Sequence, residues 1–451
     1  MMQQNDPQYQ KMIKTPIPKL ILAMAGPTII GMLVTSAYSV ADTYFVSKLG
    51  SSAAGATGIV FSLMALIQAI GFTVGMGAGS VISRLLGKKE NDKAQEIAST
   101  ALMTSAVLGV ILSVVGLLFL EKFMLLLGAT ETILPYAMDY ARYILYAAPA
   151  MTASFVLNNL LRAEGKTNLA VIGIVVGGIL NIGLDPLFMF AFGMGMEGAA
   201  LATAVSQTIG FVILFCCFLG KKMTIHFSLR KITKDLSVYK AFLKDGMPSL
   251  FRQGLASVAS VALNRAASSY GDSTVAAMSI VGKIFMVVFC ILIGLGQGYQ
   301  PVAGYNYGAK EYGRVKSAFR FVIWVGTIGM IALGVGLYGI TPWLMEMFVS
   351  GDENALEIGT QALRMQCAVM PLLPLGTACN MTFQAVGKPV TAAFLAACRQ
   401  GVWFLPFIWV FPRVFGVGGM EAAQPAADAA TFLICIPFMV YFLKQLKQKE
   451  K

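Results

Sequence analysis

Long apolar blocks separated by short polar segments form the dominant pattern of this sequence. The blocks are about 20 residues long, which is the length of a helix that crosses the hydrocarbon core of a bilayer. Stretches such as Ile97–Leu120 and Phe321–Tyr338 contain no charged residue. Because lipid offers the backbone no hydrogen-bond partner, such blocks form helices or the strands of a closed barrel. Barrel strands alternate polar and apolar positions and these blocks do not, so the pattern predicts transmembrane helices.

The apolar blocks predict twelve spans in an all-α polytopic membrane protein. The spans cover approximately residues 17–47, 52–84, 94–121, 133–161, 168–192, 197–220, 246–270, 275–304, 317–345, 358–384, 391–412 and 417–443. The longest polar stretch, residues 221–245, lies between the sixth and seventh spans and is predicted to be a cytoplasmic linker. It divides the chain into an N-lobe, residues 1–220, and a C-lobe, residues 246–451, with six transmembrane helices in each.

The two halves repeat each other. Several matched residues share an offset of 221 positions, namely Pro27 with Pro248, Gly50 with Gly271 and Gly87 with Gly308. Later pairs such as Asn158 and Asn380 are one position further apart. Six spans per repeat mean that both halves enter the membrane from the same side, which is the arrangement of parallel repeats. The sequence therefore predicts two six-helix bundles with a cavity between them, as alternating access requires.

Composition and charge agree with a membrane protein. Hydrophobic residues make up 57% of the 451 positions and charged residues only 12%, about half the charged share of a soluble protein. The formal net charge is +12, and the basic residues gather in every second loop, for example at Lys88, Lys89 and in the stretch 221–245. Alternate loops hold acidic residues such as Glu121 instead. This positive-inside pattern predicts that both termini are cytoplasmic, and it argues against nucleic acid as a partner.

The residues of common enzyme sites are missing from the sequence. The seven cysteines lie in or beside apolar blocks without the spacing of a metal site or a disulfide framework. The one histidine, His226, lies in the polar central stretch. The N-terminus from Met1 to Pro16 is polar and has no signal-peptide pattern, so we interpret it as a cytoplasmic tail. We expect neither an enzyme nor a bound cofactor.

Acidic residues inside predicted spans are the strongest functional signal, because a carboxylate in lipid is costly and marks a site. Asp42 lies toward the outer end of the first span, and Asp185 lies near the end of the fifth. Tyr38 and Asn181 precede these aspartates by four residues, which places each pair on one helix face. Thr203 lies in the sixth span toward the same side of the membrane.

These side chains predict a site for a coupling cation. Two carboxylates, an amide and a hydroxyl supply the hard oxygen ligands of a Na⁺ site. The same carboxylates could instead share a proton, because two like charges in a low dielectric repel each other. The predicted site, for H⁺ or Na⁺, consists of Tyr38, Asp42, Asn181, Asp185 and Thr203.

The stretch Asp42–Gly50, the Asn181/Asp185 pair and the stretch Ala199–Thr203 resemble the N-lobe cation site of the multidrug and toxic compound extrusion (MATE) family. The resemblance covers essentially the whole chain and is closest to the MepA-like multidrug group. It implies an antiporter of the bacterial cytoplasmic membrane that exports amphipathic, often cationic, drug-like compounds in exchange for H⁺ or Na⁺. It also implies that the two aspartates, Asn181 and Thr203 bind the coupling cation and that Tyr38 lines the same pocket. No obligate protein partner is expected.

The second half departs from the NorM-like branch of that family, which carries acidic residues in its seventh and tenth spans. The corresponding stretches here, Gly246–Leu263 and Gln366–Phe383, contain no Asp or Glu. A second sodium site of that kind is therefore not expected. The residues predicted to line the substrate cavity are Asn158, Arg252, Gln253 and Lys283.

A flippase for a lipid-linked oligosaccharide or another lipid is the alternative function. Related superfamilies share the paired-bundle layout, and cationic cavity residues such as Arg252 would suit a pyrophosphate. The cationic residues have a simpler explanation as well, because they can snorkel to the membrane interface. Drug-like organic cations and membrane lipid are thus the partners that the sequence predicts.

Overall fold

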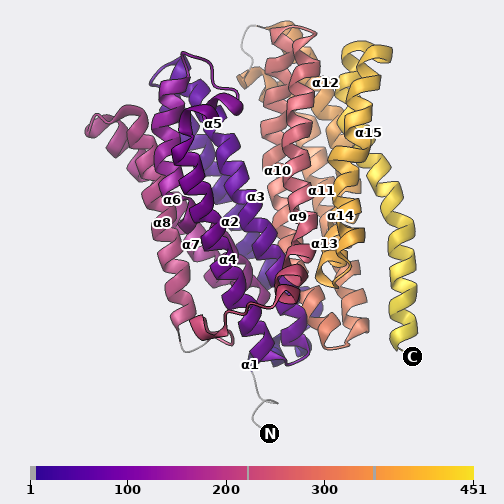
Figure 1. The fold of residues 1–451 in the computed structure, drawn as a ribbon. Helices are drawn as coiled ribbons and strands as arrows, with labels where there is room; N and C mark the ends of the chain where they lie inside the picture. Colours follow the sequence, from indigo (N-terminus) through magenta and orange to yellow (C-terminus); the bar gives the residue numbers. More distant parts are fainter. Residues whose placement is uncertain (1–6, 221–222, 349–351, 451) are drawn as a thin grey trace.

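The computed structural model describes residues 7–220, 223–348 and 352–450, with the side chains of residues 51 and 54 left aside. Within these residues the chain forms helices and no β-strand. The reason is that the apolar blocks must satisfy their backbone hydrogen bonds within each segment. Two bundles of long helices lie next to each other, coloured indigo to magenta and orange to yellow (Figure 1).

The first bundle contains the helices before the central connection. They are α1 (Pro7–Lys14), α2 (Ile17–Ser47), α3 (Ser51–Gly87), α4 (Asn91–Leu118), α5 (Leu120–Leu126), α6 (Leu134–Ala163), α7 (Thr167–Pro186), the π-helix η2 (Leu187–Ala191) and α8 (Gly195–Leu219). The helices α1 and α5 are too short to cross a bilayer. The remaining helices provide the six spans of this half.

The second bundle follows the short 3₁₀ turn η3 (Leu229–Lys231). Its elements are α9 (Leu236–Ser268), α10 (Asp272–Gly308), α11 (Tyr312–Phe348), α12 (Glu353–Val369), the 3₁₀ turn η4 (Met370–Leu372), α13 (Leu373–Ala385), α14 (Pro389–Ala397), the π-helix η5 (Cys398–Trp403) and α15 (Phe404–Glu450). Gly416 interrupts α15 with non-helical backbone angles, φ 60° and ψ −141°, and so separates the last two spans.

Twelve spans follow from these elements. Within residues 7–220, 223–348 and 352–450, nine helices are long and apolar enough to cross a membrane, and one of them, Pro389–Glu450, holds the two spans on either side of Gly416. The other two spans are less apolar. One is α9, which starts with polar residues, and the other is the α12–α13 segment, which is broken at η4. The prediction of an all-α, twelve-span membrane protein in two bundles is confirmed.

The boundary of the predicted linker differs from the structure. Residues 236–245 of the stretch 221–245 lie in α9. Asp235 begins this helix, because its carboxylate accepts a hydrogen bond from the backbone N–H of Ser237 at 2.9 Å. The first turns of α9 are polar, so a prediction based on apolar blocks alone placed them in the linker. Residues 221 and 222 of the linker lie outside the described residues.

The two bundles contact each other through α3 against α9 and α2 against α10. The ends of α3 and α10 also meet, with almost no space between the backbones. A β-carbon on Gly87 would lie 2.1 Å from the carbonyl oxygen of Tyr305, and one on Gly308 would lie 2.1 Å from that of Arg84. Both glycines and both carbonyl residues are related by the repeat offset of 221 positions. The repeat seen in the sequence is therefore a structural repeat at the contact between the bundles.

Helix α1 lies at the end of the molecule where α15 also finishes (Figure 1). Gln8 Nε2 donates to the carbonyl oxygen of Glu164 in the first half at 2.6 Å. From the second half, Arg314 Nη2 donates to the carbonyl oxygens of Met12 at 3.3 Å and Thr15 at 2.7 Å. The side chain of Met12 is fully buried. Part of the predicted N-terminal tail is thus a helix that connects the two halves.

The arrangement predicts the orientation of the chain in the membrane. A reporter domain inserted within residues 225–232 and one fused to the C-terminus should both report cytoplasm, because the basic loops and the end of α15 share one side. A reporter inserted between α5 and α6, near Thr130, is the matched control and should report the opposite side. Identical signals from all three positions would contradict the twelve-span topology.

Candidate functional site

Three helices of the first bundle bring the predicted cation residues together. Tyr38 and Asp42 lie on α2, Asn181 and Asp185 lie on α7, and Thr203 lies on α8. Gly178 allows α7 to approach α2 closely. A β-carbon at this position would come within 2.8 Å of Val34 Cγ1 and 3.3 Å of Tyr38 Cδ1. Any larger residue on this face of α7 would push the two carboxylate-bearing helices apart.

A hydrogen-bond network connects four of the five predicted residues. Tyr140 of α6 donates to the carboxylate of Asp42, with distances of 3.2 Å to Oδ1 and 3.1 Å to Oδ2. The same hydroxyl lies 3.2 Å from Thr203 Oγ1. Asn181 Nδ2 donates to Thr203 Oγ1 at 3.1 Å and to Asp185 Oδ1 at 3.3 Å. The network therefore joins helices α2, α6, α7 and α8 at one point of the first bundle.

Two oxygen atoms of this network are buried and unpaired. Asn181 Oδ1 and Asp185 Oδ2 have no hydrogen-bond partner, and the two residues are 1% and 0% exposed. Buried acceptors are almost always paired, so each such exception calls for an explanation. The five ion pairs recorded for the described residues include neither Asp42 nor Asp185. The oxygens therefore fit a cation ligand set, and a proton on Asp185 would suit them equally, because a carboxyl O–H can donate to an amide oxygen.

The backbone next to Asp185 is irregular. Pro186 ends α7 and is followed by the π-helix η2, Leu187–Ala191. Proline has no N–H to continue the helical ladder, and π-turns within helices occur frequently at functional sites. The wide turn places an interruption directly after one of the two carboxylates.

Tyr140 was absent from the sequence prediction, and Tyr38 lies beside the network on α2. Tyr140 is 2% exposed and bridges Asp42 and Thr203. Nothing in the sequence around it links it to residues 98 positions earlier and 63 positions later. Tyr38 instead accepts a hydrogen bond from Gln207 Nε2 at 3.4 Å. It borders the network through α2 and α8 without bonding to the carboxylates.

The second bundle contains an acidic residue with a different environment. Asp428 of α15 is 3% exposed and accepts hydrogen bonds from Arg399 Nε at 2.6 Å, Gln366 at 2.8 Å and Gln424 at 3.0 Å. Its charge is therefore balanced by a guanidinium within the same bundle. This carboxylate has the features of a structural ion pair and not those of a cation site.

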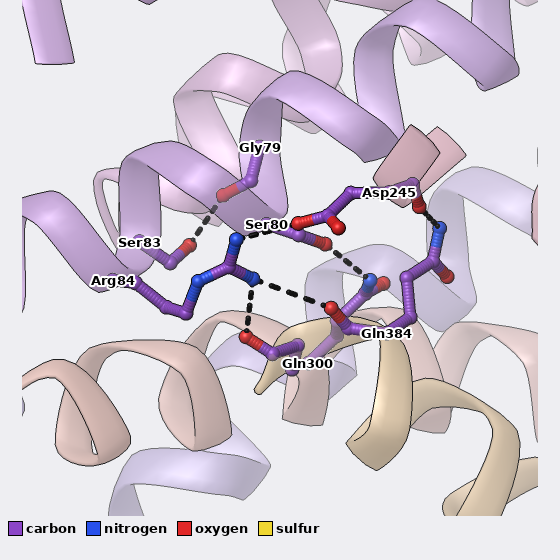
Figure 2. Close-up of polar contacts among 8 residues, drawn as sticks. Gly79, Ser80, Ser83, Arg84, Asp245, Gln300 and Gln384 are labelled. Carbon is purple, nitrogen blue, oxygen red and sulfur yellow. Dashed lines mark hydrogen bonds and ion pairs between the residues drawn. The ribbon is translucent and has the colours of Figure 1, made fainter. Parts of the chain in front are cut away.

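The lobes are held together in the half of the molecule that lies towards α1. Arg84 of α3 pairs with Asp245 of α9 at 2.5 Å and donates to the carbonyl oxygen of Ala385, near the end of α13, at 2.9 Å. Figure 2 shows the guanidinium of Arg84 between Asp245 and Gln384, whose carbonyl oxygen accepts a longer bond of 3.4 Å. Nearby, Gln300 Nε2 donates to Ser80 Oγ at 3.0 Å across the same interface. In the described part of the chain, the side-chain hydrogen bonds between the lobes lie in this half.

The residues predicted to line a substrate cavity do not form one cluster. Asn158 is 3% exposed and donates to the carbonyl oxygen of Ala170 at 2.6 Å. Arg252 is partly buried at the interface between the lobes, where Nη1 donates to Asn380 Oδ1 at 3.3 Å. The side chain of Gln253 is partly buried, and Lys283 is exposed on α10 and has no ion pair with any described residue.

Comparisons with known proteins agree with one another. A sequence model of the MatE family matches residues 27–187 and again residues 248–410, once in each half. The multidrug export protein MepA of Staphylococcus aureus (strain N315) is 26% identical over 441 residues, 97% of this chain and 97% of that protein. MepA of Staphylococcus haemolyticus (strain JCSC1435) is 27% identical over 434 residues, 96% and 95% of the two chains. A multidrug resistance MATE family transporter, solved in an outward-facing conformation, superposes with a TM-score of 0.92 at 26% identity, covering 97% of this chain and 98% of that one.

Two asparagine substitutions should change stability in opposite directions. In Asp185→Asn the new amide can donate to the unpaired Asn181 Oδ1, so it should raise the free energy of unfolding by about 1–3 kcal/mol. In Asp428→Asn the partly buried Arg399 loses its counter-ion, so the same quantity should fall by roughly 3–5 kcal/mol. Thermal unfolding in detergent at alkaline pH, with choline chloride and no sodium, measures both. A destabilised Asp185→Asn protein would show that Asp185 is a satisfied structural residue.

Proposed function

The chain belongs to the MatE family, and from this premise we propose that it exports amphipathic, drug-like organic compounds across the bacterial cytoplasmic membrane, driven by inward flow of Na⁺ or H⁺. The family consists of transporters, which supports the expectation that the chain is not an enzyme. Relatives that share 97% of its length are named multidrug export proteins. The observation that carries the proposed ion coupling is the pair of buried, unpaired oxygens, Asn181 Oδ1 and Asp185 Oδ2.

The network gives each residue a role in cation binding. Na⁺ bound here would take oxygen ligands from Asp42, Asp185 and neutral groups of Asn181 and Thr203, and a proton would be held by one of the carboxylates. Tyr140 positions Asp42 and Thr203 through its two hydrogen bonds. Because the ligands come from α2, α7 and α8, the cation would draw these helices of the first bundle together. A ligand shifts an equilibrium by its differential affinity for the two states, and this is how the cation would favour one arrangement of the lobes.

Alternating access requires that the lobes can separate where they are now joined. The ion pair between Arg84 and Asp245, with the carbonyl of Ala385, closes one end. The side-chain hydrogen bonds between described residues of the two lobes are confined to that half, which supports a structure closed on the cytoplasmic side. Export would then proceed by exchange between this arrangement and one in which Arg84 leaves its partners. The flippase alternative is not favoured by the names of the relatives.

Transport measurements in proteoliposomes test the proposed function. Purified protein should drive uptake or efflux of a fluorescent drug when a sodium or a proton gradient is imposed separately. The Asp42→Asn variant should insert and fold but lose gradient-driven transport, because the amide keeps the shape and removes the charge. Asp272→Asn, which changes an exposed acidic residue on α10, is the matched control. Transport at a normal rate by Asp42→Asn would remove the network from the coupling mechanism.

Substitution of Thr203 should distinguish the two ions. Thr203→Val removes an oxygen ligand at nearly constant volume, so it should weaken sodium-stimulated transport by roughly tenfold, the effect of losing about 1.4 kcal/mol of binding. Proton-driven transport should change much less, since a proton needs one carboxylate only. Initial rates as a function of sodium concentration give the comparison. An equal loss in both modes would show that Thr203 only packs.

Removal of the Arg84 ion pair should open the closed end. In the Arg84→Gln background, a cysteine introduced as Ser249→Cys should react with a membrane-impermeant maleimide from the cytoplasmic side roughly tenfold faster, a shift of about 1.4 kcal/mol between the states. Ser249 is fully buried at this interface beside Met76. Lys93→Gln removes the Lys93–Glu90 pair within one lobe at the same end and should leave the rate unchanged. Equal labelling rates of Ser249→Cys with and without Arg84→Gln would contradict a gating role for Arg84.

A further inference from the structure

A small polar cavity lies between the lobes, above the Arg84 ion pair. Its walls come from both halves, with Met76, Ser80 and Arg162 on one side and Gln297 and Gln300 on the other. The volume of this cavity is ≈ 20 Å³, which is enough for about one or two water molecules. No acidic residue lines it. Arg162 supplies the only charge among its lining residues.

Arg162 is a buried cation without a counter-ion. Arg162 is 4% exposed, and it forms no ion pair with any residue in the described part of the chain. Nη1 donates to Gln297 Oε1 of the opposite lobe, Nη2 donates to Asn158 Oδ1, and Nε has no partner. A guanidinium stays charged in proteins. Neutral amides therefore take the positions that a carboxylate or another oxyanion would fill.

A second unpaired guanidinium approaches the same cavity from the C-lobe. Arg252 Nη2 donates to the sulfur of Met76, a residue of the cavity wall, at 3.2 Å. Its other described partner is the neutral Asn380. By contrast, Arg84 and Arg399 each pair with a buried carboxylate. Arg252 does not line the cavity itself, but through Met76 it brings a second guanidinium without a carboxylate partner to the cavity wall.

We infer that Arg162 and Arg252 together bind an oxyanion group of the transported compound, so that the substrates are amphipathic anions or zwitterions carrying a carboxylate, sulfonate or phosphate. The inference rests on the proposed export function and names its substrate class. Arginine binds such groups with two parallel, charge-assisted hydrogen bonds. Neither guanidinium suits a purely cationic compound, which two positive charges in a low dielectric would repel.

In the present arrangement of the lobes the oxyanion group of a substrate cannot reach Arg162, so it must enter when the lobes are apart. The cavity is too small for a drug-sized molecule, and the bond from Arg162 to Gln297 crosses the interface. When the lobes separate at this end, Gln297 moves away with its own lobe and Arg162 loses one of its two partners. An oxyanion from the cytoplasm would replace it. Because the anion binds the open state more tightly than the closed one, it favours opening at the side from which the substrate is taken.

Two rhodamine dyes that differ only in a methyl ester provide the test. The acid dye carries a free carboxylate and is a zwitterion, and the ester dye is a cation of the same size and shape. Binding of each dye to the purified full-length protein is measured by fluorescence anisotropy. The unmodified protein should bind the acid dye more tightly. In Arg162→Gln the affinity for the acid dye should fall more than about tenfold, and the affinity for the ester dye should stay within about twofold.

Further variants separate charge recognition from structure. Arg162→Lys keeps the charge and should retain part of the preference for the acid dye. Arg252→Gln should reduce it as Arg162→Gln does. Arg142→Gln removes an exposed cation from the same helix, α6, and should leave both affinities unchanged. Equal losses for both dyes in Arg162→Gln would show that Arg162 only holds the lobes together, and a preference of the unmodified protein for the ester dye would overturn the inference.

Failure of the inference is distinguishable from failure of the proposed function. Gradient-driven export of the ester dye without binding of the acid dye would leave the export function intact and reject the anion site. Absence of gradient-driven transport for either dye, together with tight binding of the acid dye, would reject the export function alone. Transbilayer movement of fluorescent phosphatidylglycerol that depends on Arg162, with no preference between the dyes, would assign the guanidiniums to a lipid phosphate and overturn the drug-like substrate class.

Discussion

The need to balance buried charge governs the whole structure. A charged side chain inside a membrane-embedded bundle finds a partner or serves a function, because lipid cannot solvate it. Three of the six buried charged residues among the described residues have an ion-pair partner. Asp245 pairs with Arg84, Asp428 pairs with Arg399, and Glu164 pairs with Lys166 at 2.6 Å while it accepts the backbone N–H of Ile225. These pairs fix the lobes, the interior of the second bundle and the central connection in place.

The groups without an ion-pair partner include two sets of opposite charge that lie in different places. The carboxylates of Asp42 and Asp185 lie within the first bundle, whereas the guanidiniums of Arg162 and Arg252 lie at the interface between the lobes. A further buried carboxylate, Glu421 of α15, lies in the second bundle and has no partner for Oε2. Ligands of opposite charge would therefore bind at separate sites and need not compete for the same side chains. Coupling between them would run through the positions of the lobes, because α2 and α3 of the first bundle form the contacts with α10 and α9.

The sequence predicted the elements better than the contacts between them. Span number, the repeat and the pairing of Asn181 with Asp185 follow from local spacing, and the structure has each of them. Tyr140 could not be found in this way, because its partners lie on other helices. The Arg84–Asp245 pair could not be predicted from the repeat either. The residues at the matching positions, 221 places away, are Tyr305 and Met24. The ion pair therefore has no counterpart at the repeat-related position of the interface.

The sign of the substrate changes the energetics of exchange. If one Na⁺ or H⁺ enters for each organic cation that leaves, no net charge crosses the membrane and the membrane potential contributes nothing. If the exported compound is a zwitterion, one of the two classes that we infer from the guanidiniums, each exchange moves one positive charge inward. Such a step gains about 2.3 kcal/mol per 100 mV of inside-negative potential. An anion would move two charges and gain twice as much. The unpaired arginines between the lobes would therefore decide which compounds are recognised and also how strongly the membrane potential drives their export.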